Sequence, residues 1–490
     1  MPQIRGVLNA LARRMRAPRA GERLDPARFL THAAALAARA PAPPGLWLSL
    51  IGEASPADWG QDGPVERVGD AALARAPFVA RLDPGGRLTP YAAQRIAAAL
   101  AAHPHAEALY TDEAIADSRG RPSAIVLKPA FDPVLLEAFD YFGRLAVYRR
   151  ERVAALGGFG RGDHALARAV AGAAGPGAIL HLPYPAYIGA PRAAPITVPK
   201  LGPPPGGWPH VSVVIPSRDA PGLMGAALAG LFEGTDYPDF DLTVIDNGST
   251  DPQTLALYRR YAEPRLRVEI RPEPFNFSRA VNRGVGLSAG PLVLLLNNDI
   301  EVIEPGWLKE MVACLSFPDT GIVGAKLLYP DGTLQHAGVI AGLGGYAGHW
   351  HIGRPESEPG PQGRLGARQS LSVVTGACML VTRACFAALG GFDEQTFPIA
   401  YNDVDFCLRA GAAGWRVVWT PLARLVHHES ASRGSDETAE NRARFARDKA
   451  ALQSRHATDV CEDRAYNPWA SRSDSDPWPM ARTNLPPARI

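Results

Sequence analysis

A single carboxylate follows an uninterrupted apolar run near residue 295. Leu292 to Leu296 are five consecutive apolar residues, and Asn297, Asn298 and Asp299 come directly after them. Such a run is typical of a strand that is covered on both faces, as in a parallel sheet. Ligands of an open α/β sheet lie outside the carboxyl ends of its strands. Asp299 is therefore a candidate ligand for Mg²⁺ or Mn²⁺ on a diphosphate, because such ions combine one or two carboxylates with phosphate oxygens. The alternative is a polar strand end before a turn.

Two earlier strands are predicted to end in polar groups at the same edge. The first leads into Pro216, Ser217 and Arg218, and the second leads into Asp246. Backbone groups of the first segment could bind a base, and Arg218 could approach a phosphate. Asp246 could accept hydrogen bonds from a ribose or a base edge. Its alternative role is an Asx turn or a helix cap.

Two carboxylates and two histidines later in the chain could act as a base and as a metal ligand. Asp403 and Asp405 stand at the start of a predicted amphipathic helix, where they also suit the helix dipole. Side chains two apart on a helix diverge by roughly 200° about its axis, so only one of them can face a given substrate. His427 and His428 follow a short apolar run. One imidazole could complete the coordination begun by Asp299.

Strands and helices alternate from residue 210 to about 435. Strands are predicted at 211–215, 242–245, 265–270 and 292–296, with helices at 224–232, at 252–261 and around Asn282. This alternation is typical of βαβ units and predicts an α/β fold with a mostly parallel central sheet. The polar groups that end these strands are then expected at one edge of the sheet.

Residues 210 to about 435 resemble a family 2 glycosyltransferase with the GT-A fold. The matching segments, in this order, are VSVVIPSRD, VIDNGSTD, FNFSRAVNRG, LLLNNDIEV, TGACML, GGFDE, YNDVDFCLR and VHHESASRG. The set is most similar to bacterial O-antigen and capsule sugar transferases, rhamnosyltransferase-like ones included. The resemblance implies a nucleotide-sugar-binding domain and an inverting transfer from a nucleotide-diphosphate sugar. The acceptor would be a glycan or a lipid-linked sugar in the synthesis of cell-surface polysaccharide.

The resemblance also implies a role for each candidate residue. Asp403 would be the base on the acceptor hydroxyl, and Asp299 and His427 would hold Mn²⁺ or Mg²⁺. The donor would be bound by Pro216, Ser217, Arg218, Asp246, Asn276, Asn282 and Asn298. In one respect the chain departs from the family, because the D-x-D pattern reads Asn297-Asn298-Asp299. A single acid predicts a low metal affinity or a relaxed metal dependence.

Two other functional classes remain open. A nucleotidyltransferase also binds a nucleotide and a metal on an α/β sheet, but it is expected to carry a glycine-rich basic phosphate loop, which PSRDAPG matches poorly. A catalytically impaired sugar-binding or scaffold protein is favoured by the single-acid motif. The intact set of Asp299, Asp403 and His427 argues against that class.

The first half contains an altered copy of part of the same pattern. AVYRRERVAALGGF at 146–159 parallels MLVTRACFAALGGF at 379–392, and LDPG at 82–85 aligns with LNND at 296–299. Gly85 thus stands where the metal carboxylate would be. No convincing counterpart of IPSRD or IDNGSTD precedes it. We therefore predict a degenerate and truncated GT-A-like α/β domain, in which Asp112 and Glu113 are the candidates for a relic site.

Composition shifts divide the chain into five predicted parts. A stretch that contains PPPGG at 203–207 marks the main boundary. The parts are a basic helical segment at 1–45, the degenerate domain at 46–195, a linker at 196–209, the catalytic domain at 210–435, and a C-terminal helix and tail at 436–490. The tail, rich in Ser, Pro, Asp and Arg, is expected to be mobile or laid across the catalytic domain.

Charge and cysteine usage narrow the partners and the location. A net charge of +2 without long basic runs argues against nucleic acid as the main partner. Five cysteines without C-x-x-C spacing predict reduced thiols in a cytoplasmic protein. No apolar segment approaches the ~18–20 residues of a membrane span. The basic N-terminus favours an ordinary solvated helix end and leaves open a peripheral association with the inner membrane face.

Overall fold

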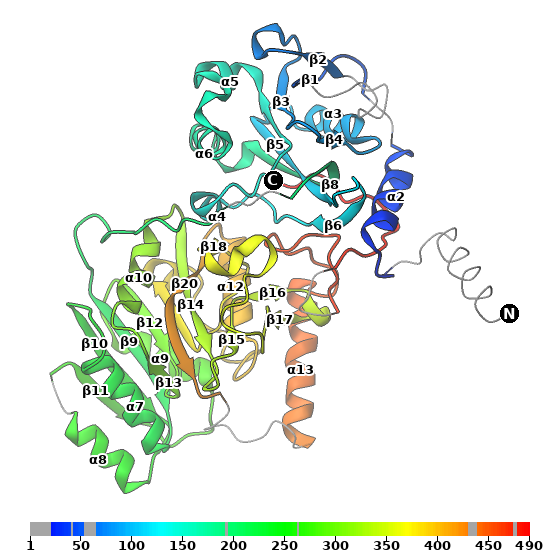
Figure 1. Ribbon diagram of the computed structural model, residues 1–490. Coiled ribbons are helices and arrows are strands. Elements are labelled where there is room, and N and C mark those ends of the chain that lie inside the picture. The colour runs from blue at the N-terminus through cyan, green and yellow to red at the C-terminus, as the bar shows by residue number, and fades with distance from the viewer. Residues whose placement is uncertain are drawn as a thin grey trace. The chain divides into compact units, whose positions relative to one another are not determined.

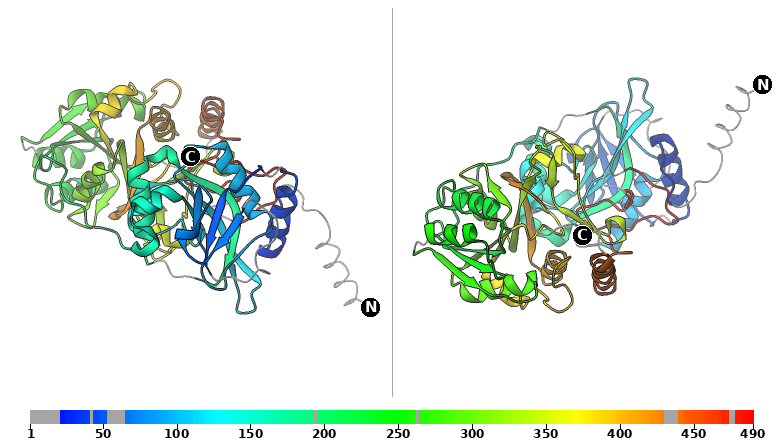
Figure 2. Two further views of the ribbon diagram at one scale, coloured as in Figure 1. Left: turned by 90° about the horizontal axis from the view of Figure 1, so that it is seen from above. Right: turned by 90° about the horizontal axis from the view of Figure 1, so that it is seen from below.

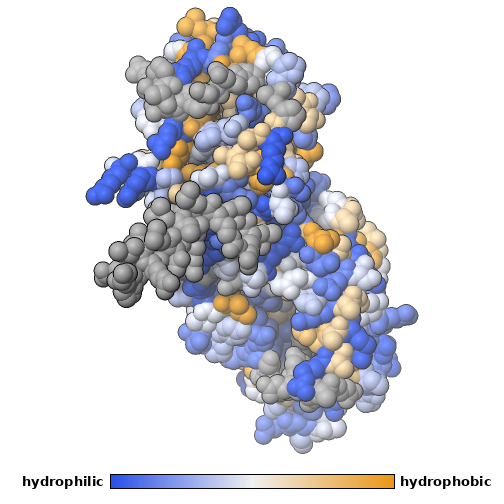
Figure 3. All heavy atoms as spheres, turned by 90° about the vertical axis from the view of Figure 1, so that its right-hand side faces the viewer, coloured by the Kyte–Doolittle hydropathy of each residue, from blue (hydrophilic) through white to orange (hydrophobic). Residues whose placement is uncertain are grey.

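The computed structural model describes residues 21–40, 43–52, 65–191, 195–261, 264–429, 439–473 and 478–490. Backbone contacts divide the chain into a first unit, Met1–Thr197 with Arg464–Ile490, and a second unit, Val198–Asp463. The predicted basic segment lies outside the described residues as far as residue 20. Among the described helices, none has the length and apolarity needed to cross a membrane. On the face that Figure 3 shows, hydrophobic side chains form small groups among hydrophilic ones, as is normal for a surface in water.

The second unit is built on a ten-stranded mixed sheet with the order β11-β10-β9-β12-β19-β14-β20-β13 (Figure 1). The main strands are β9 Val211–Ser217, β10 Phe240–Asp246, β11 Leu266–Ile270, β12 Leu292–Leu296, β13 Ile300–Val302, β14 Thr320–Leu328, β19 Cys378–Thr382 and β20 Arg416–His427. Strands β11, β10, β9 and β12 are parallel, whereas β19 is antiparallel to both β12 and β14. Short strands β15 Leu334–His336 and β18 Gln369–Ser370 join this sheet, and β16 Val339–Ala341 pairs with β17 Ala347–His349.

Helices alternate with the parallel strands as the sequence predicts. The helices of the second unit are α7 Pro221–Phe232, α8 Pro252–Arg260, α9 Phe277–Leu287, α10 Trp307–Ala313, α11 Arg383–Ala388, α12 Asn402–Ala412 and α13 Ala439–His456. Asp251 and Asn276 begin α8 and α9 by accepting a backbone N–H bond from the first turn. Every residue of β9 and β12 is buried, which is the pattern of strands covered on both faces. The predicted α/β class is therefore confirmed.

The first unit has an eight-stranded sheet with the order β2-β1-β3-β7-β5-β8-β4, and β6 pairs with β5. Its elements are α2 Pro26–Ala37, β1 Leu48–Ile51, β2 Val65–Val68, β3 Phe78–Arg81, β4 Arg87–Leu88, α3 Ala92–Ala102, β5 Ala108–Ala116, β6 Pro122–Val126, α4 Pro133–Ala138, β7 Ala146–Arg149, α5 Arg150–Ala155, α6 Asp163–Ala174 and β8 Ile179–Gly189. The two parallel strands β1 and β2 thus precede β3, although no sequence motif predicted them.

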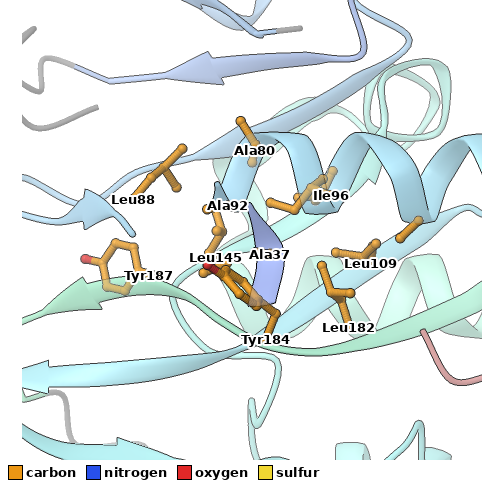
Figure 4. Close-up of a cluster of buried hydrophobic side chains, with 14 of the residues drawn as sticks. Ala37, Ala80, Leu88, Ala92, Ile96, Leu109, Leu145, Leu182, Tyr184 and Tyr187 are labelled. Carbon is orange, nitrogen blue, oxygen red and sulfur yellow. The ribbon is translucent and has the colours of Figure 1, made fainter. Parts of the chain in front are cut away.

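The core of the first unit lies between its sheet and helix α3 (Figure 4). Ile96 of α3 is fully buried together with Leu109 of β5 and Leu182 of β8. Tyr184 of β8 packs in the same cluster and donates its hydroxyl to the carbonyl of Pro90 at 2.5 Å. Each such aliphatic side chain contributes about 1.5–3 kcal/mol through burial. The first unit therefore has a core of its own.

The C-terminal tail belongs to the first unit, so the prediction that it is mobile or lies across the catalytic domain is wrong. His181 and Arg489 exchange two backbone hydrogen bonds of 2.8 Å. Trp469 is fully buried, packs edge-on against Phe29 at 5.0 Å, and donates its indole N–H to the carbonyl of Pro183 at 2.6 Å. In both views of Figure 2 the red C-terminal segment runs among blue and cyan elements. The polar composition of the tail suggested mobility, but the burial of the Trp469 side chain fixes the tail to the first unit.

Trp469→Ala is expected to destabilise the first unit by about 3–5 kcal/mol, because a large buried side chain is lost and a cavity remains. Hydrogen exchange of the β5 and β8 backbone amides in the full chain measures this loss. Trp478→Ala is the matched control, since Trp478 is partly exposed and contacts Arg23 through a cation–π pair at 4.9 Å. That control should cost about 1 kcal/mol or less. Equal protection in wild type and Trp469→Ala would show that the tail does not hold the unit together.

Candidate functional site

Two pockets adjoin at the carboxyl ends of the parallel strands of the second unit. The large pocket has a volume of about 380 Å³ and the small pocket about 270 Å³. Three residues line both of them, namely Phe277, Asn297 and Asp299. Asp299, the predicted metal carboxylate, therefore stands where the two pockets meet.

Strand pairing brings the two predicted metal ligands together from distant parts of the sequence. Strand β13 begins directly after Asp299 and pairs with the end of β20, so that Ile300 lies opposite His427. The backbone N–H of His428 donates to the carbonyl of Asp299 at 3.0 Å. As a result, Nε2 of His427 lies 3.2 Å from Oδ1 of Asp299, and both side chains are nearly buried. The structure thus brings these two side chains together, and their role as metal ligands stays a prediction.

The separation of the pair fits two ligands of one ion. Ligands about 2.1 Å from an octahedral cation and at right angles to each other lie about 3 Å apart. The described residues contain no cluster of three or more potential metal-ligating side chains. An ion held here would therefore take its other ligands from phosphate oxygens and water, which is the usual arrangement for Mg²⁺. The pair fits a cation shared with a diphosphate.

Asp403 lines the large pocket, and backbone groups fix its orientation. Helix α12 begins after Tyr401, whose φ of 57° turns the chain. Oδ2 of Asp403 accepts the N–H of Gly376 at 2.9 Å, and Oδ1 accepts the N–H of Val404 at 2.8 Å. Each oxygen keeps a lone pair that can take a proton from a substrate.

Asp405 is fully buried and does not line either pocket. Its Oδ2 accepts from Nε of Arg409 at 2.8 Å, and its Oδ1 accepts from Arg455 and His456 at 2.9 Å each. Burial opposes ionisation of Asp405, but these hydrogen bonds outweigh it and lower the pKa of the carboxyl. The two neighbouring carboxylates of α12 therefore have separate surroundings.

Four of the seven predicted donor-binding residues line the small pocket, namely Pro216, Ser217, Arg218 and Asn298. Asn298 donates its amide N–H to Oγ of Ser217 at 3.1 Å, which ties the end of β12 to the end of β9. The Arg218 side chain is 64% exposed, with Asp219 at 3.8 Å, so its guanidinium is available to a ligand. These four residues come together as predicted from their strand ends.

Asp246 is fully buried and is not among the residues that line the pockets. Its carboxylate accepts the N–H and the hydroxyl of Ser249 and the hydroxyl of Tyr258, each at 2.6 Å. This is the Asx-turn role that the sequence left as the alternative. The turn presents the adjacent Asn247 to the small pocket. A direct nucleotide contact of Asp246 stays a prediction.

Asn276 and Asn282 are also absent from the pocket linings and make internal hydrogen bonds. Asn276 caps α9 by accepting the N–H of Arg279 at 2.9 Å. Asn282 accepts the N–H of Phe392 at 2.9 Å and donates to Oε1 of Glu394 at 2.8 Å. Both residues thereby fix the start of α9 against the GGFDE loop, and that helix start places Phe277 on the wall shared by the pockets.

Two histidines of the large-pocket region did not stand out in the sequence. His349 lines the pocket, and its Nδ1 lies 3.2 Å from Nδ1 of the fully buried His336. Nε2 of His336 accepts the backbone N–H of Thr375 at 3.3 Å. Burial lowers the pKa of both imidazoles, so both are uncharged at neutral pH. They shape the pocket wall without adding positive charge to it.

Two other lining residues were missed although they lie beside predicted site residues in the sequence. Glu429 lines the large pocket and accepts from Tyr329 at 3.0 Å and from Gln335 at 3.1 Å. It follows His427 and His428 within the segment VHHES, which is the signal that could have found it. Phe277 likewise lies in FNFSRAVNRG, but only its asparagines were singled out.

Comparisons with known proteins identify the family to which residues 209–447 are similar. Residues 209–447, which contain every predicted site residue, match the model of the Glycosyltransferase like family 2. The O-antigen biosynthesis protein RfbC of Myxococcus xanthus is 36% identical over 413 residues, which cover 75% of this chain and 32% of RfbC. The N-acetylglucosaminyl-diphospho-decaprenol L-rhamnosyltransferase of Mycobacterium tuberculosis is 30% identical over 228 residues, which cover 43% of this chain and 73% of that enzyme.

The two relatives that match most of this chain are longer than it is. The chain spans 48% of one of them and 32% of RfbC. Among solved structures, the Pyrobaculum calidifontis mannosyltransferase PcManGT, in complex with GDP-Man and Mn²⁺, is similar with a TM-score of 0.38 and 19% identity, over 53% of this chain and 73% of that one. The family match and the mixed α/β sheet confirm the predicted GT-A-type fold class. On the strength of the rhamnosyltransferase match and the family match, the chain belongs to the glycosyltransferase-like family 2.

Proposed function

We propose that the second unit transfers a sugar, with inversion, from a nucleotide-diphosphate sugar to a glycan or lipid-linked acceptor of cell-surface polysaccharide synthesis. The observation that carries this proposal is the junction of the two pockets at Asp299, with Asp403 in the large pocket only. A donor in one pocket and an acceptor in the other would meet at that junction. The names of RfbC and of the rhamnosyltransferase support a surface glycan as product.

The small pocket suits the nucleotide and the diphosphate. The ends of β9 and β12 line it with Ser217 and Asn298, and Phe275 adds an aromatic face. Arg218 can neutralise a phosphate by charge-assisted hydrogen bonds. Asp299 and His427 would hold the divalent cation, Mn²⁺ or Mg²⁺. That cation supplies Lewis-acid stabilisation of the departing nucleotide diphosphate.

The large pocket suits the acceptor, because it contains the proposed base. In an inverting transfer the acceptor hydroxyl attacks the anomeric carbon from the face opposite the diphosphate. Asp403 would remove the proton of that hydroxyl as the new bond forms. The N–H groups of Gly376 and Val404 hold the carboxylate in one orientation for this step. Phe277 and Asn297 form the boundary at which the two substrates would meet.

A panel of nucleotide sugars tests the proposal. The full chain is incubated with each donor, with Mn²⁺ or Mg²⁺ and with a lipid extract that contains glycan acceptors, and the released nucleotide diphosphate is measured. Release with at least one donor is expected, and it should depend on the cation. Binding without any release would favour a sugar-binding scaffold protein. Formation of a nucleoside triphosphate and a sugar phosphate when pyrophosphate is added would favour a nucleotidyltransferase.

We further propose that the first unit is a degenerate copy of the same fold. With β2, β1, β3, β7, β5 and β8 matched to β10, β9, β12, β19, β14 and β20, both sheets have the same strand order and directions. Phe78 pairs with Arg149 as Leu292 pairs with Thr382. Arg149 and Thr382 are equivalent in the sequence repeat, so this register supports the alignment of Gly85 with Asp299.

A copy without a metal carboxylate should bind no donor, so one nucleotide sugar per chain is expected. Calorimetry on the full chain measures this stoichiometry, since the tail that completes the first unit comes from the end of the chain. Asp299→Ala provides the control, because it should remove most of the metal-dependent binding. A second site that survives Asp299→Ala would show that the first unit retains a donor site.

The proposed location is the cytoplasm, where nucleotide sugars are made. Cys314, Cys378, Cys385, Cys407 and Cys461 are all free thiols, which suits a reducing compartment. If the acceptor is lipid-linked, the chain would associate peripherally with the inner face of the membrane.

A further inference from the structure

Helix α13 supplies one wall of the large pocket. Arg444 and Phe445 of this helix line it, although the sequence predicted only a C-terminal helix there. The ring of Phe445 stacks on Tyr401, with centroids 5.2 Å apart and planes inclined by 26°. Tyr401 is the residue from which α12 begins, two positions before Asp403. The wall made by α13 therefore reaches the immediate neighbourhood of the proposed base.

Little apolar burial holds this helix in place. Among its described side chains, the one large aliphatic group that is fully buried is Leu452. Phe445 is 37% exposed, and Asp448 is a buried carboxylate. Hydrophobic packing normally positions a surface helix through a continuous apolar stripe. Polar contacts must therefore contribute much of the placement of α13.

Those polar contacts concentrate at the C-terminal end of α13. Arg455 donates to Oδ1 of Asp405 at 2.9 Å and to Oδ2 of Asp393 at 2.8 Å. His456 donates to the same Oδ1 of Asp405 at 2.9 Å. Gln453 adds a hydrogen bond to the carbonyl of Gly345 at 3.0 Å. Because Asp405 is fully buried, its hydrogen bonds to cations are strong and have fixed geometry.

We propose that Asp405 is a positioning residue for the acceptor: by holding Arg455 and His456, it places the Arg444–Phe445 wall opposite Asp403. The exposed part of Phe445, whose ring also has the Lys449 ammonium 4.7 Å from its centroid, is suited to the apolar side of an acceptor sugar, and Arg444 to a polar or anionic group beside it. The two carboxylates of α12 then have complementary tasks. Asp403 acts on the acceptor hydroxyl, and Asp405 holds the wall that orients the acceptor. This inference rests on the proposed function of the large pocket.

Arg455→Gln and Asp405→Asn in the full chain test the inference. Each variant should raise the acceptor KM by about tenfold to a hundredfold, the range expected for a displaced binding wall. The kcat at saturating acceptor and the donor Kd should stay within about twofold of wild type. Hydrogen exchange should become faster in peptides from 442–456 and stay unchanged in β9 and β12. Arg455→Lys keeps the charge and should restore most of the acceptor affinity.

Arg447→Gln is the matched control, because it neutralises an exposed cation on the same helix that is not part of the Asp405 cluster. It should change neither KM nor hydrogen exchange. Unchanged exchange of 442–456 in both test variants would overturn the anchor. Faster exchange of 442–456 with an unchanged acceptor KM would show that α13 does not orient the acceptor. A lower kcat with an unchanged KM would show that Asp405 takes part in the chemical step. A wild-type protein that releases no nucleotide would refute the proposed function. Hydrogen exchange would still show whether Asp405 holds helix α13 in place.

Discussion

Replacement of Asp299 by alanine is expected to abolish sugar transfer and to weaken metal-dependent nucleotide binding. Asp299 is the carboxylate that lines both pockets, and Nε2 of His427 lies 3.2 Å from it. A cation at this point would stabilise the charge of the leaving diphosphate by several kcal/mol, so kcat should fall by about 10³-fold or more. Turnover at saturating donor measures this loss, and calorimetry with and without Mn²⁺ measures the binding.

Glu301→Gln is the matched control for this variant. Glu301 is a neighbouring carboxylate on β13, accepts a hydrogen bond from Nε2 of His428 at 2.9 Å, and lies outside both pocket linings. Its neutralisation should leave transfer close to wild type. Normal activity of Asp299→Ala, or of the wild-type protein in excess EDTA, would show that transfer does not require a divalent cation. The single-acid motif makes this test decisive, because no second carboxylate of the motif could compensate.

Replacement of Asp403 by asparagine is expected to lower kcat by at least about 10²-fold while the donor Kd stays unchanged. Asparagine keeps the shape but cannot accept the hydroxyl proton. The donor contacts should survive, because Asp403 lines the large pocket and not the small one. Single-turnover rates and donor titrations separate the two effects.

The same variant has a predictable structural cost. Asp403 accepts one N–H bond at each carboxylate oxygen, from Gly376 and from Val404. An amide has one oxygen, so one of these N–H groups would lose its partner, at a cost of about 1–3 kcal/mol. The melting temperature should therefore be recorded together with kcat. A collapse of donor affinity would move Asp403 to the donor site, and normal turnover with an inactive Asp405→Asn would reverse the two roles.

The strands and the order of the elements could be predicted because their signals are local. The apolar run 292–296 coincides with β12, and the strand that leads to Asp246 ends at that residue. Helical spacing also separated Asp403 from Asp405, which the structure places in different surroundings. These features depend on periodicity within a few residues. The contact of Ser217 with Asn298 follows instead from the pairing of the parallel strands β9 and β12, whose polar ends were predicted at one edge.

The rest of the site could not be predicted, because it depends on contacts between distant segments. Phe445 lines the large pocket because hydrogen bonds to Asp405 hold helix α13 in place, and no local sequence pattern predicts that Phe445 contacts a ligand. Asp246 has the residue type of a nucleotide contact, yet Ser249 and Tyr258 occupy its oxygens. Trp469 anchors a tail whose composition alone suggests mobility. In each case one tertiary contact outweighs the local pattern.

The stereochemistry of transfer tests the central claim most directly. A proton NMR time course of the full chain, with the donor found by the panel and its acceptor, records the anomeric coupling of the first-formed product together with the released nucleotide diphosphate. If Asp403 is the base of a direct displacement at the junction of the two pockets, the product has the inverted anomeric configuration, with one nucleotide diphosphate per bond formed. A product that retains the donor configuration, or the absence of nucleotide diphosphate release with every donor, would contradict the account.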